Sequence, residues 1–486
     1  MKVNGQIHRI YILLIVLISL LIWKPIFDQV PMGEGYYYFD KCQNKFIVPS
    51  DCPTTIWQYD NLARISFQIM IPLFKDNIHL YMFAQIGMML LLYITFYLVM
   101  SKVTKNPMLA FFTVLVFLTN HTGSFSMMAI GNYQRFVQRV PNLIPILISF
   151  YFIFKYFDTK KYSNLVKSII LYALGFYLAH HSIFMLPLFA AFIFLNTISQ
   201  KLSFKSVIIN IGIIIILSGI SIVLSLTDHF VPKQGLMSFI ITTPQIIEKT
   251  MLQVPNLLVP TEIVRLIARN WPISPIPYPF SFVLELFAVP LFLILIISLF
   301  LVKNNTNAKL ILKSAILALP VVCLLNLYSY GDGAPHPLRD FGEDRIYFIP
   351  SIYGSILLGY FINSIYVKGK ILSKFIAIAI LITYVFYNSH LIQRDSKKLT
   401  PTSTKMEQFI EYVKAKTHNR DAKIMIVGPS HLLWPIQFVT LFYNTNNNLS
   451  FALDSSSWGE TISKSDYDEI KSIDYIDNKI LEKTIK

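Results

Sequence analysis

The chain has 486 residues, of which 54% are hydrophobic and 14% are charged, and its mean hydropathy is +0.53. These values exclude a soluble globular protein of ordinary composition and indicate an integral membrane protein. The formal net charge is +15, but the cations are spread over many short loops and do not form one stripe or tail. We therefore expect membrane lipid, and no nucleic acid, as the partner of this charge.

Apolar stretches predict an all-α polytopic fold, because a helix needs roughly 20 mostly apolar residues to cross the hydrocarbon core. Eleven stretches qualify as candidate transmembrane helices: 9–27, 78–101, 107–120, 142–157, 164–179, 182–198, 205–227, 281–302, 308–329, 345–366 and 371–390. The polar break Ala179-His180-His181-Ser182 divides a run that is too long for one helix. We predict two short helices there, since a single helix would reverse the side of every later loop.

Lysines occupy every second gap between these stretches, beginning with Lys2 and continuing through Lys102, Lys161, Lys201, Lys309 and Lys370. The positive-inside rule makes these gaps cytoplasmic. We therefore predict a multi-pass protein of the cell (inner or plasma) membrane with a cytoplasmic N-terminus and an extracytoplasmic C-terminus. The alternate gaps then form outer loops, of which the main ones are residues 28–77, 120–141, 228–280 and 330–344.

The outer segments contain further predicted elements. Apolar residues recur at helical spacing from Ile56 to Met70, and a similar part runs from Pro244 to Asn270, which predicts amphipathic helices lying on the membrane. The composition changes after residue 390. We predict a transmembrane module over 1–390 and a small extracytoplasmic α/β domain over 391–486, with an amphipathic helix at 402–417, a strand within 423–430 and a mobile final twenty residues.

Two outer acids are candidate catalytic bases. Glu34 lies between two glycines, which permit close approach of a substrate, and Asp40 ends the run Tyr36-Tyr37-Tyr38-Phe39. A carboxylate just beyond a transmembrane helix can accept a proton from an acceptor group, while Tyr36 and Tyr37 can stack against a sugar ring. The alternative is that both acids are solvated loop residues and the tyrosines form an interfacial aromatic belt.

Arginines supply the candidate phosphate-binding groups. Arg135 with Arg139, and Arg265 with Arg269, are spaced four apart, so each pair would project from one helix face. Arg345 directly precedes an apolar stretch and should stand at the outer mouth of that helix. Guanidinium groups suit bidentate phosphate binding. Lipid-headgroup anchoring by the pairs, and a local ion pair of Arg345 with Glu343 or Asp344, remain as alternatives.

Histidine and cysteine give weaker indications. His180 and His181 are about 100° apart on a helix, which is poor geometry for one metal ion, so we expect substrate contact and no metal site there. Tyr347, beside Arg345, is a further candidate substrate-binding residue. Cys42 and Cys52 lie close together in an outer loop, where a disulfide is plausible and two free thiols are the alternative.

This layout resembles the GT-C superfamily of membrane glycosyltransferases, which use polyprenyl-phosphate-linked sugars. The resemblance covers the first span, the long outer loop with an early acid in Gly-Glu34-Gly-Tyr-Tyr, the many further spans, the late Asp-Arg345-Ile-Tyr and the small outer tail. It implies that Glu34, with Asp40 as the competing choice, is the base and that Arg345 meets the donor phosphate. The short helices meeting at His180 and His181 also resemble that fold. The sequence departs from the family in having a single Glu34 flanked by glycines where an Asp-Glu or Asp-Asp pair is expected.

The resemblance implies transfer of a sugar from a polyprenyl-phosphate donor to a glycan, lipid or protein acceptor, with inversion. No cofactor is expected to be required, because arginines can neutralise the leaving phosphate; a divalent metal ion is possible but not predicted. Two alternatives stay open. One is a polymerase or ligase that acts on lipid-linked oligosaccharide, and the other is a lipid or solute transporter.

Overall fold

A computed structural model of the protein describes residues 2–27, 29–30, 61–121, 140–199, 204–225, 306–330, 347–367, 370–417, 423–428, 449–453, 468–476 and 479–484, with short pieces between 250 and 297 and between 438 and 443. The helices of this part are α1 Lys2–Trp23, α3 Asn61–Phe74, α4 Ile78–Thr104, α5 Pro107–Thr119, α8 Leu143–Thr159, α9 Tyr162–Leu178, α10 Leu186–Ser199, α11 Phe204–Ser225, α16 Asn307–Tyr330, α17 Ser351–Val367 and α18 Ile371–Thr417, with the 3-10 turns η1 Lys24–Ile26 and η4 His180–Met185.

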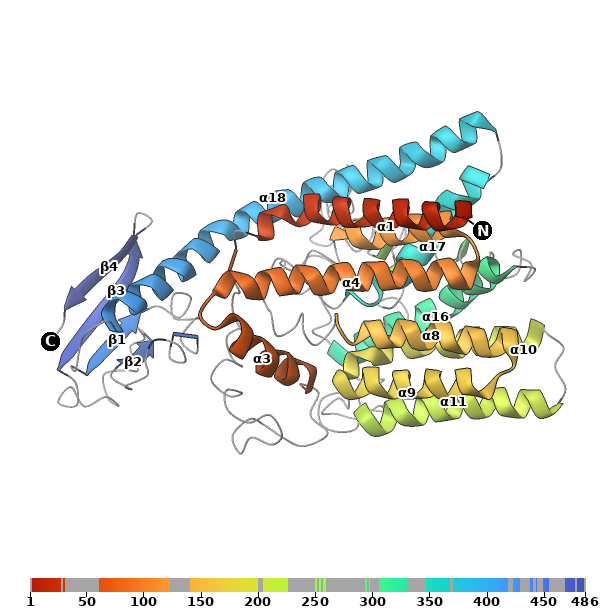
Figure 1. The fold of residues 1–486 in the computed structure, drawn as a ribbon, viewed down its shortest axis with the longest axis horizontal. Helices are drawn as coiled ribbons and strands as arrows, with labels where there is room; N and C mark the ends of the chain where they lie inside the picture. The colour runs from red at the N-terminus through yellow and green to blue at the C-terminus, as the bar shows by residue number, and fades with distance from the viewer. Residues whose placement is uncertain are drawn as a thin grey trace, which may run out of the picture.

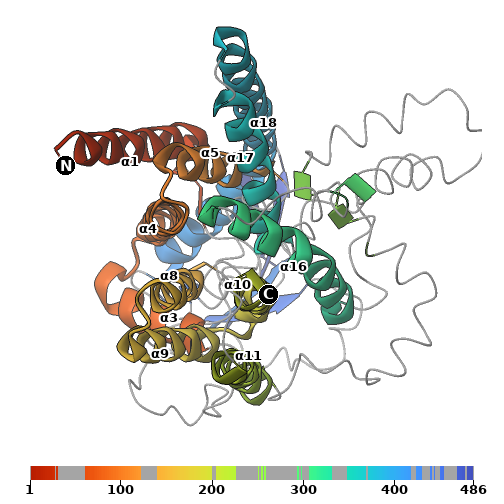
Figure 2. The same ribbon diagram turned by 90° about the vertical axis from the view of Figure 1, so that its right-hand side faces the viewer.

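Long apolar helices dominate the described chain, as the hydropathy pattern predicts (Figure 1). Six of those that the structure describes are long and apolar enough to cross a membrane, so the protein is membrane-embedded. Ten of the eleven predicted ranges overlap a described helix. The eleventh, 281–302, lies mostly outside the described residues. Figure 2 shows α8, α9, α10 and α11 on one side of α4, and α1, α5, α17 and α18 on the other.

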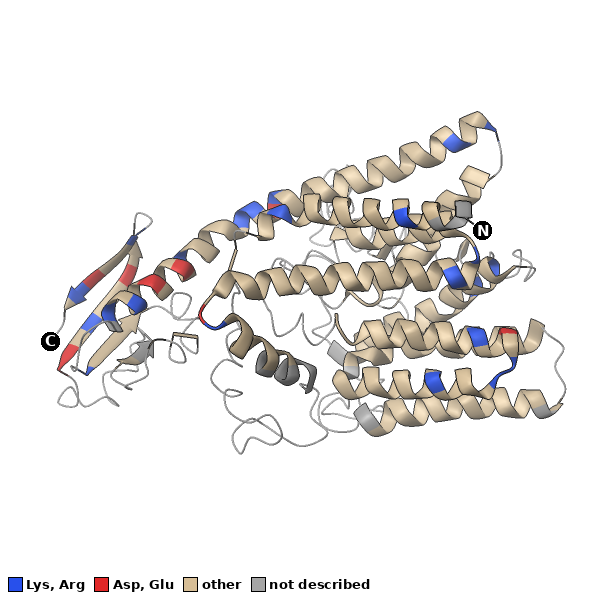
Figure 3. Cartoon of the chain, in the orientation of Figure 1, with Lys and Arg blue, Asp and Glu red and all other residues tan. Residues whose placement is uncertain are grey.

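Lysines gather at one end of the helix bundle (Figure 3). Lys102 lies in the last turn of α4, and the neighbouring helix ends place Lys105, Lys160, Lys161, Lys309 and Lys370 at the same end. Tight turns join the helices here. Asn106 caps α5 by accepting hydrogen bonds from the backbone N–H groups of Met108 and Leu109 at 3.1 and 3.0 Å, and Pro107 occupies the first helical position.

The predicted break near residue 180 is confirmed. α9 ends at Leu178, η4 follows, and α10 then turns back toward α9. The rings of Tyr172 in α9 and Phe189 in α10 lie 5.1 Å apart, which shows that the two helices are in contact. The turn is held by polar groups. Asn142 Nδ2 donates to Ser182 Oγ at 2.8 Å, and Ser182 Oγ donates to the Gly175 carbonyl at 3.0 Å. A helical hairpin thus replaces one long helix.

Helix α18 is longer than expected. The sequence predicts an end near residue 390 and a separate helix at 402–417, but the structure has one continuous helix of 47 residues that crosses the predicted domain boundary and contains Pro401. At 1.5 Å per residue it is about 70 Å long, more than twice the hydrocarbon thickness. Its apolar first half, 371–390, is enough for one crossing, and the remainder projects beyond the end of the bundle that lies opposite the chain's N-terminus (Figure 1).

The projecting half of α18 packs on a four-stranded sheet of order β2-β1-β3-β4. The strands are β1 Ile424–Gly428, β2 Leu449–Leu453, β3 Glu469–Ile476 and β4 Lys479–Thr484; β1 is parallel to β2 and β3, and β4 is antiparallel to β3. The predicted apolar face of Met406, Phe409, Ile410 and Val413 is buried, and the predicted strand within 423–430 is present as β1. The expectation of a mobile end is wrong, since β3 and β4 occupy it.

Outside the bundle, α3 confirms a helix within the first predicted amphipathic region. It covers 61–74, and Met70 is buried while Ile69 and Leu73 are exposed. In the second region, 244–270, only Thr250, Gln253, Val254, Leu257 and Leu258 are described, and all five are helical.

Candidate functional site

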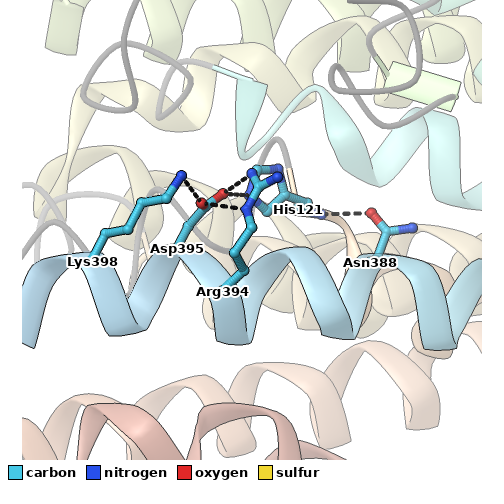
Figure 4. Close-up of polar contacts among 5 residues, drawn as sticks. All are labelled: His121, Asn388, Arg394, Asp395 and Lys398. Atoms are coloured by element: carbon cyan, nitrogen blue, oxygen red, sulfur yellow. Dashed lines mark hydrogen bonds and ion pairs between the residues drawn. The ribbon is translucent and has the colours of Figure 1, made fainter. Parts of the chain in front are cut away.

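Charged side chains gather on α18 just beyond its apolar half (Figure 4). The Asp395 carboxylate is 1% exposed and accepts from Arg394 Nε at 2.8 Å and Arg394 Nη2 at 2.7 Å. Lys398 Nζ lies 2.9 Å from Asp395 Oδ1, and His121 Nε2 lies 3.0 Å from Oδ2. We call these four residues, His121, Arg394, Asp395 and Lys398, the Asp395 cluster.

The end of α5 brings His121 to α18. The His121 backbone N–H donates to Asn388 Oδ1 at 3.2 Å, and Asn388 Nδ2 donates to the Tyr384 carbonyl at 2.9 Å. Asn120 Nδ2 also reaches Tyr384, whose hydroxyl it contacts at 3.4 Å. Asn388 and Asp395 are seven residues apart, which is two helical turns, so they share one face of α18. That face therefore holds the end of α5 at two levels.

Charge complementarity stabilises Asp395 as an anion. Burial alone would raise the pKa of its carboxyl, but hydrogen bonds from His121, Arg394 and Lys398 hold that pKa well below its ordinary value. An ionised carboxylate only accepts hydrogen bonds, so His121 Nε2 carries the proton that it shares with Oδ2. Arg394 and Lys398 supply the two cations that contact this carboxylate.

The end of the first span meets α18 beside this cluster. Gln29 Nε2 donates to the Ser396 carbonyl at 3.0 Å, and the Val30 N–H donates to Ser403 Oγ at 2.8 Å. Both Gln29 and Val30 are buried. The predicted outer loops 28–77 and 120–141 therefore both start against α18. The predicted loop 330–344 leads to a segment nearby, since the ring of Phe348, just before α17, lies 5.4 Å from that of Phe117 in the last turns of α5.

Most of the residues predicted from the sequence lie outside the described part of the chain: Glu34, Tyr36, Tyr37, Asp40, Cys42, Cys52, Arg135, Arg139, Arg265, Arg269 and Arg345. His180 opens η4, and its side chain is likewise outside the description. His181 and Tyr347 are buried, at 6% and 2% exposure. The described coordinates therefore do not test whether the predicted acids and arginines come together.

Sequence reasoning missed the Asp395 cluster. The segment Arg394-Asp395-Ser-Lys-Lys398 follows directly after the last apolar stretch, and this position is the available signal. The sequence places this segment at the start of the predicted C-terminal domain, which separates its charges from those of the predicted outer loops. The sequence around His121 does not indicate a role in this cluster, because no local pattern connects it to the Asp395 carboxylate, which is 274 residues away.

Metal binding finds no support in the described residues, among which no three His, Cys, Asp or Glu side chains are grouped to hold an ion.

The chain matches no protein-family model, and no curated protein matches it significantly.

Proposed function

We propose that the protein is a membrane glycosyltransferase of the GT-C type, which moves a sugar from a polyprenyl-phosphate donor to an acceptor at the extracytoplasmic face. The observation that carries this proposal is the meeting of the ends of the predicted outer loops around α18, beside a buried acid that Arg394 and Lys398 contact. Those loops contain the candidate base and the candidate phosphate-binding residues Arg135 and Arg139. Ionisable groups gathered at a membrane rim favour a site for an anionic substrate.

Chain connectivity supports the same arrangement. Glu34 follows Val30 by four residues, and an extended chain of four residues spans at most about 14 Å. Arg139 directly precedes the buried Val140, and Arg345 precedes Tyr347 by two residues. The anchoring of Val30 on Ser403 thus limits how far the Glu34 carboxylate can lie from α18. We infer that acid and guanidinium groups share one region of the outer face.

The chemistry follows from these groups. A carboxylate, Glu34 or Asp40, takes the proton of the acceptor hydroxyl as its oxygen attacks the anomeric carbon. The bond from that carbon to the phosphate oxygen breaks, and the electron pair leaves with the prenyl phosphate. Arginine and lysine side chains stabilise the charge that grows on the phosphate. Attack opposite the leaving group inverts the anomeric centre.

Orientation belongs to the same proposal. The lysine-rich helix ends are assigned to the cytoplasm of the cell membrane by the positive-inside rule. Helix α18 begins at that end with Lys370 and Lys374 beside it and extends to the sheet at the other. The C-terminal unit and the Asp395 cluster are then extracytoplasmic, on the side where lipid-linked sugars of this class are consumed.

A transfer assay tests the proposal. Purified protein is incubated with radiolabelled prenyl-phosphate sugars and total membrane lipid, and labelled products are separated by chromatography. We expect transfer by the wild type and by Asp158→Asn, a change at an exposed acid on the lysine end, and loss of transfer in Glu34→Gln or Asp40→Asn. Full activity in both single variants would remove the proposed base. A nucleotide sugar that serves as sole direct donor, or uptake of an unaltered sugar lipid, would refute the transferase proposal.

A further inference from the structure

We propose that Lys155 of α8 and Lys167 of α9 form a binding site for the headgroup of an anionic phospholipid, whose acyl chain lies along the exposed face of α9. The site is at the lysine-rich end of the helix bundle. It does not depend on the proposed function, and only the name of the membrane leaflet depends on the predicted orientation of the chain. The inference is drawn from the charge, the ring contacts and the depth of the two lysines and from the apolar face beside them.

Positive charge is in excess where α8 turns into α9. Residues 151–170 contain four lysines and one acid, Asp158. Neither Lys155 nor Lys167 contacts a carboxylate in the part of the chain that the structure describes. Ammonium groups of this kind at a membrane surface attract anionic lipid. A zwitterionic headgroup carries its own cation beside its phosphate, so an anionic headgroup gains more from the excess charge.

Two neighbouring aromatic rings hold both lysines over one surface. Lys155 Nζ lies 5.9 Å from the centroid of the Tyr151 ring, and Lys167 Nζ lies 5.6 Å from that of the Phe152 ring. The centroids of these two rings are 5.4 Å apart. Ammonium groups from two helices are therefore brought to one aromatic pair. A ring covers one side of an ammonium group and leaves N–H donors on the other side for phosphate oxygens.

The depth of the two lysines matches a lipid headgroup. Lys155 precedes the last residue of α8 by four positions, and Lys167 follows the first residue of α9 by five, so each lies about 6–8 Å inside the end of its helix. The turn between the helices, residues 158–163, is mostly polar and fully exposed, which places it at the water boundary. The headgroup layer on each side of a bilayer is about 5–8 Å thick. Both lysines then lie at the level of lipid phosphates.

An apolar stripe continues from the lysines toward the bilayer centre. Val166, Ile170 and Leu174 of α9 are 53%, 61% and 43% exposed, and their spacing of four places them on one face. Ile170 and Leu174 also follow Lys167 by three and seven residues, so they lie on its side of the helix. Figure 2 shows α9 at the edge of the helix bundle. A soluble anion makes no use of such a stripe, whereas an acyl chain packs along it, and this favours a phospholipid.

Crosslinking with a lipid probe tests the site. The protein is placed in phosphatidylcholine nanodiscs that contain phosphatidylglycerol with a photoreactive diazirine in its acyl chain, and labelling of the peptide that contains Ile170 is measured as the probe content rises. We expect Lys155→Gln/Lys167→Gln to weaken the apparent affinity about tenfold or more. The matched control, Lys102→Gln/Lys370→Gln, removes the same charge from exposed positions at the same end of the bundle, and it should bind as the wild type does. Equal losses in the two double variants would overturn the proposal.

Competition identifies the chemistry of the ligand. A phosphatidylcholine probe with the same diazirine should label this peptide much less, because its headgroup carries no net charge. Inorganic phosphate should not displace the phosphatidylglycerol probe, because it lacks an acyl chain. Equal labelling by the two lipid probes would refute an anionic phospholipid site. Displacement by inorganic phosphate as effective as by unlabelled phosphatidylglycerol would refute it as well.

Two further variants separate the effect of charge from an effect on folding. Lys155→Arg/Lys167→Arg keeps both positive charges and should retain the wild-type affinity, whereas a loss equal to that of the glutamine variant would contradict the proposal. If the glutamine double variant does not fold, the single change Lys167→Gln, at an exposed position, replaces it. We expect a loss of about threefold to fivefold, and unchanged affinity would refute the role of Lys167.

Discussion

Asp395→Asn should destabilise the protein by about 2–5 kcal/mol. The largest share comes from the bond to His121, which is 4% exposed, because a buried hydrogen bond to a charged group contributes about 1.5–3 kcal/mol. Arg394 and Lys398 are 36% and 55% exposed. They can turn to water when the carboxylate is neutralised, so each ion pair adds only about 0.2–1 kcal/mol.

Thermal unfolding in detergent, followed by tryptophan fluorescence over a series of pH values, measures this effect. Because the pKa of Asp395 is lowered in the folded protein, its stabilisation is complete above the ordinary Asp pKa of about 3.9 and is lost as pH falls toward the folded value. The gap between wild type and Asp395→Asn should therefore be full at pH 7 and should narrow below about pH 4. Asp158→Asn, at an exposed position, should change stability by less than about 0.5 kcal/mol. Equal stability of both variants at pH 7, or a gap that widens in acid, would refute the reasoning.

Three further predictions concern other parts of the chain. The first concerns Glu482 of β4. Burial alone would raise the pKa of this carboxyl, but hydrogen bonds from Lys416 and other donors lower it to about 2. Glu482 therefore stabilises the sheet above about pH 4.3 and loses this effect as the pH falls toward 2. Glu482→Gln should speed amide hydrogen exchange in β3 and β4, and unchanged exchange would contradict this prediction. Gly359→Ala should cost about 1–3 kcal/mol, since a Cβ there would lie 2.7 Å from a Thr113 backbone carbon, whereas Gly87→Ala, with open space, should not destabilise in the same unfolding assay. Peptide mapping without reductant should find Cys42 joined to Cys52, and two alkylated thiols would exclude the bridge.

The membrane part of the fold was largely predictable. Stretches of apolar residues of sufficient length can bury their backbone polar groups in lipid only as helices, so hydropathy located seven of the described helices to within about four residues; α1 begins seven residues before its predicted start, α17 begins six after, and α18 ends far beyond its predicted end. The break before His180 was also predictable. A single helix through this region would put Lys201 and Lys303 on the outer side, against the positive-inside rule, whereas two helices keep both lysines on the cytoplasmic side. Burial of Met406, Phe409 and Val413 likewise follows from helical spacing.

The continuity of α18 could not be predicted from local sequence. Residues 394–404 are polar and include Pro401, which is typical of a linker. They are held by partners from distant parts of the chain: Gln29 and Val30 bind there from the end of the first span. The strands β3 and β4 were missed for a related reason. Their charged side chains pair across the sheet and with α18, as Lys471 does with Glu482 at 2.5 Å, and such pairing has no local signature.

The residues of the candidate site also fall into two groups, those that the sequence alone indicates and those that depend on the tertiary fold. Glu34 and the paired arginines were selected because their types and spacing are visible in the sequence, and they remain predictions. The Asp395 cluster depends on a contact between segments 274 residues apart, and a carboxylate beside an arginine and a lysine on one helix is otherwise an ordinary surface pattern. Only the tertiary fold makes this acid a buried one.

The anchoring of the first span on α18 also has a consequence for biosynthesis. Gln29 and Ser396 are 367 residues apart, and a ribosome that adds about 5–20 residues per second needs roughly 20–70 s to cover that distance. Throughout this interval Gln29 and Val30 have no Ser396 carbonyl or Ser403 hydroxyl to bind, and His121 waits roughly 14–55 s for Asp395, which is 274 residues away. This end of the bundle is therefore completed only after α18 has been synthesised.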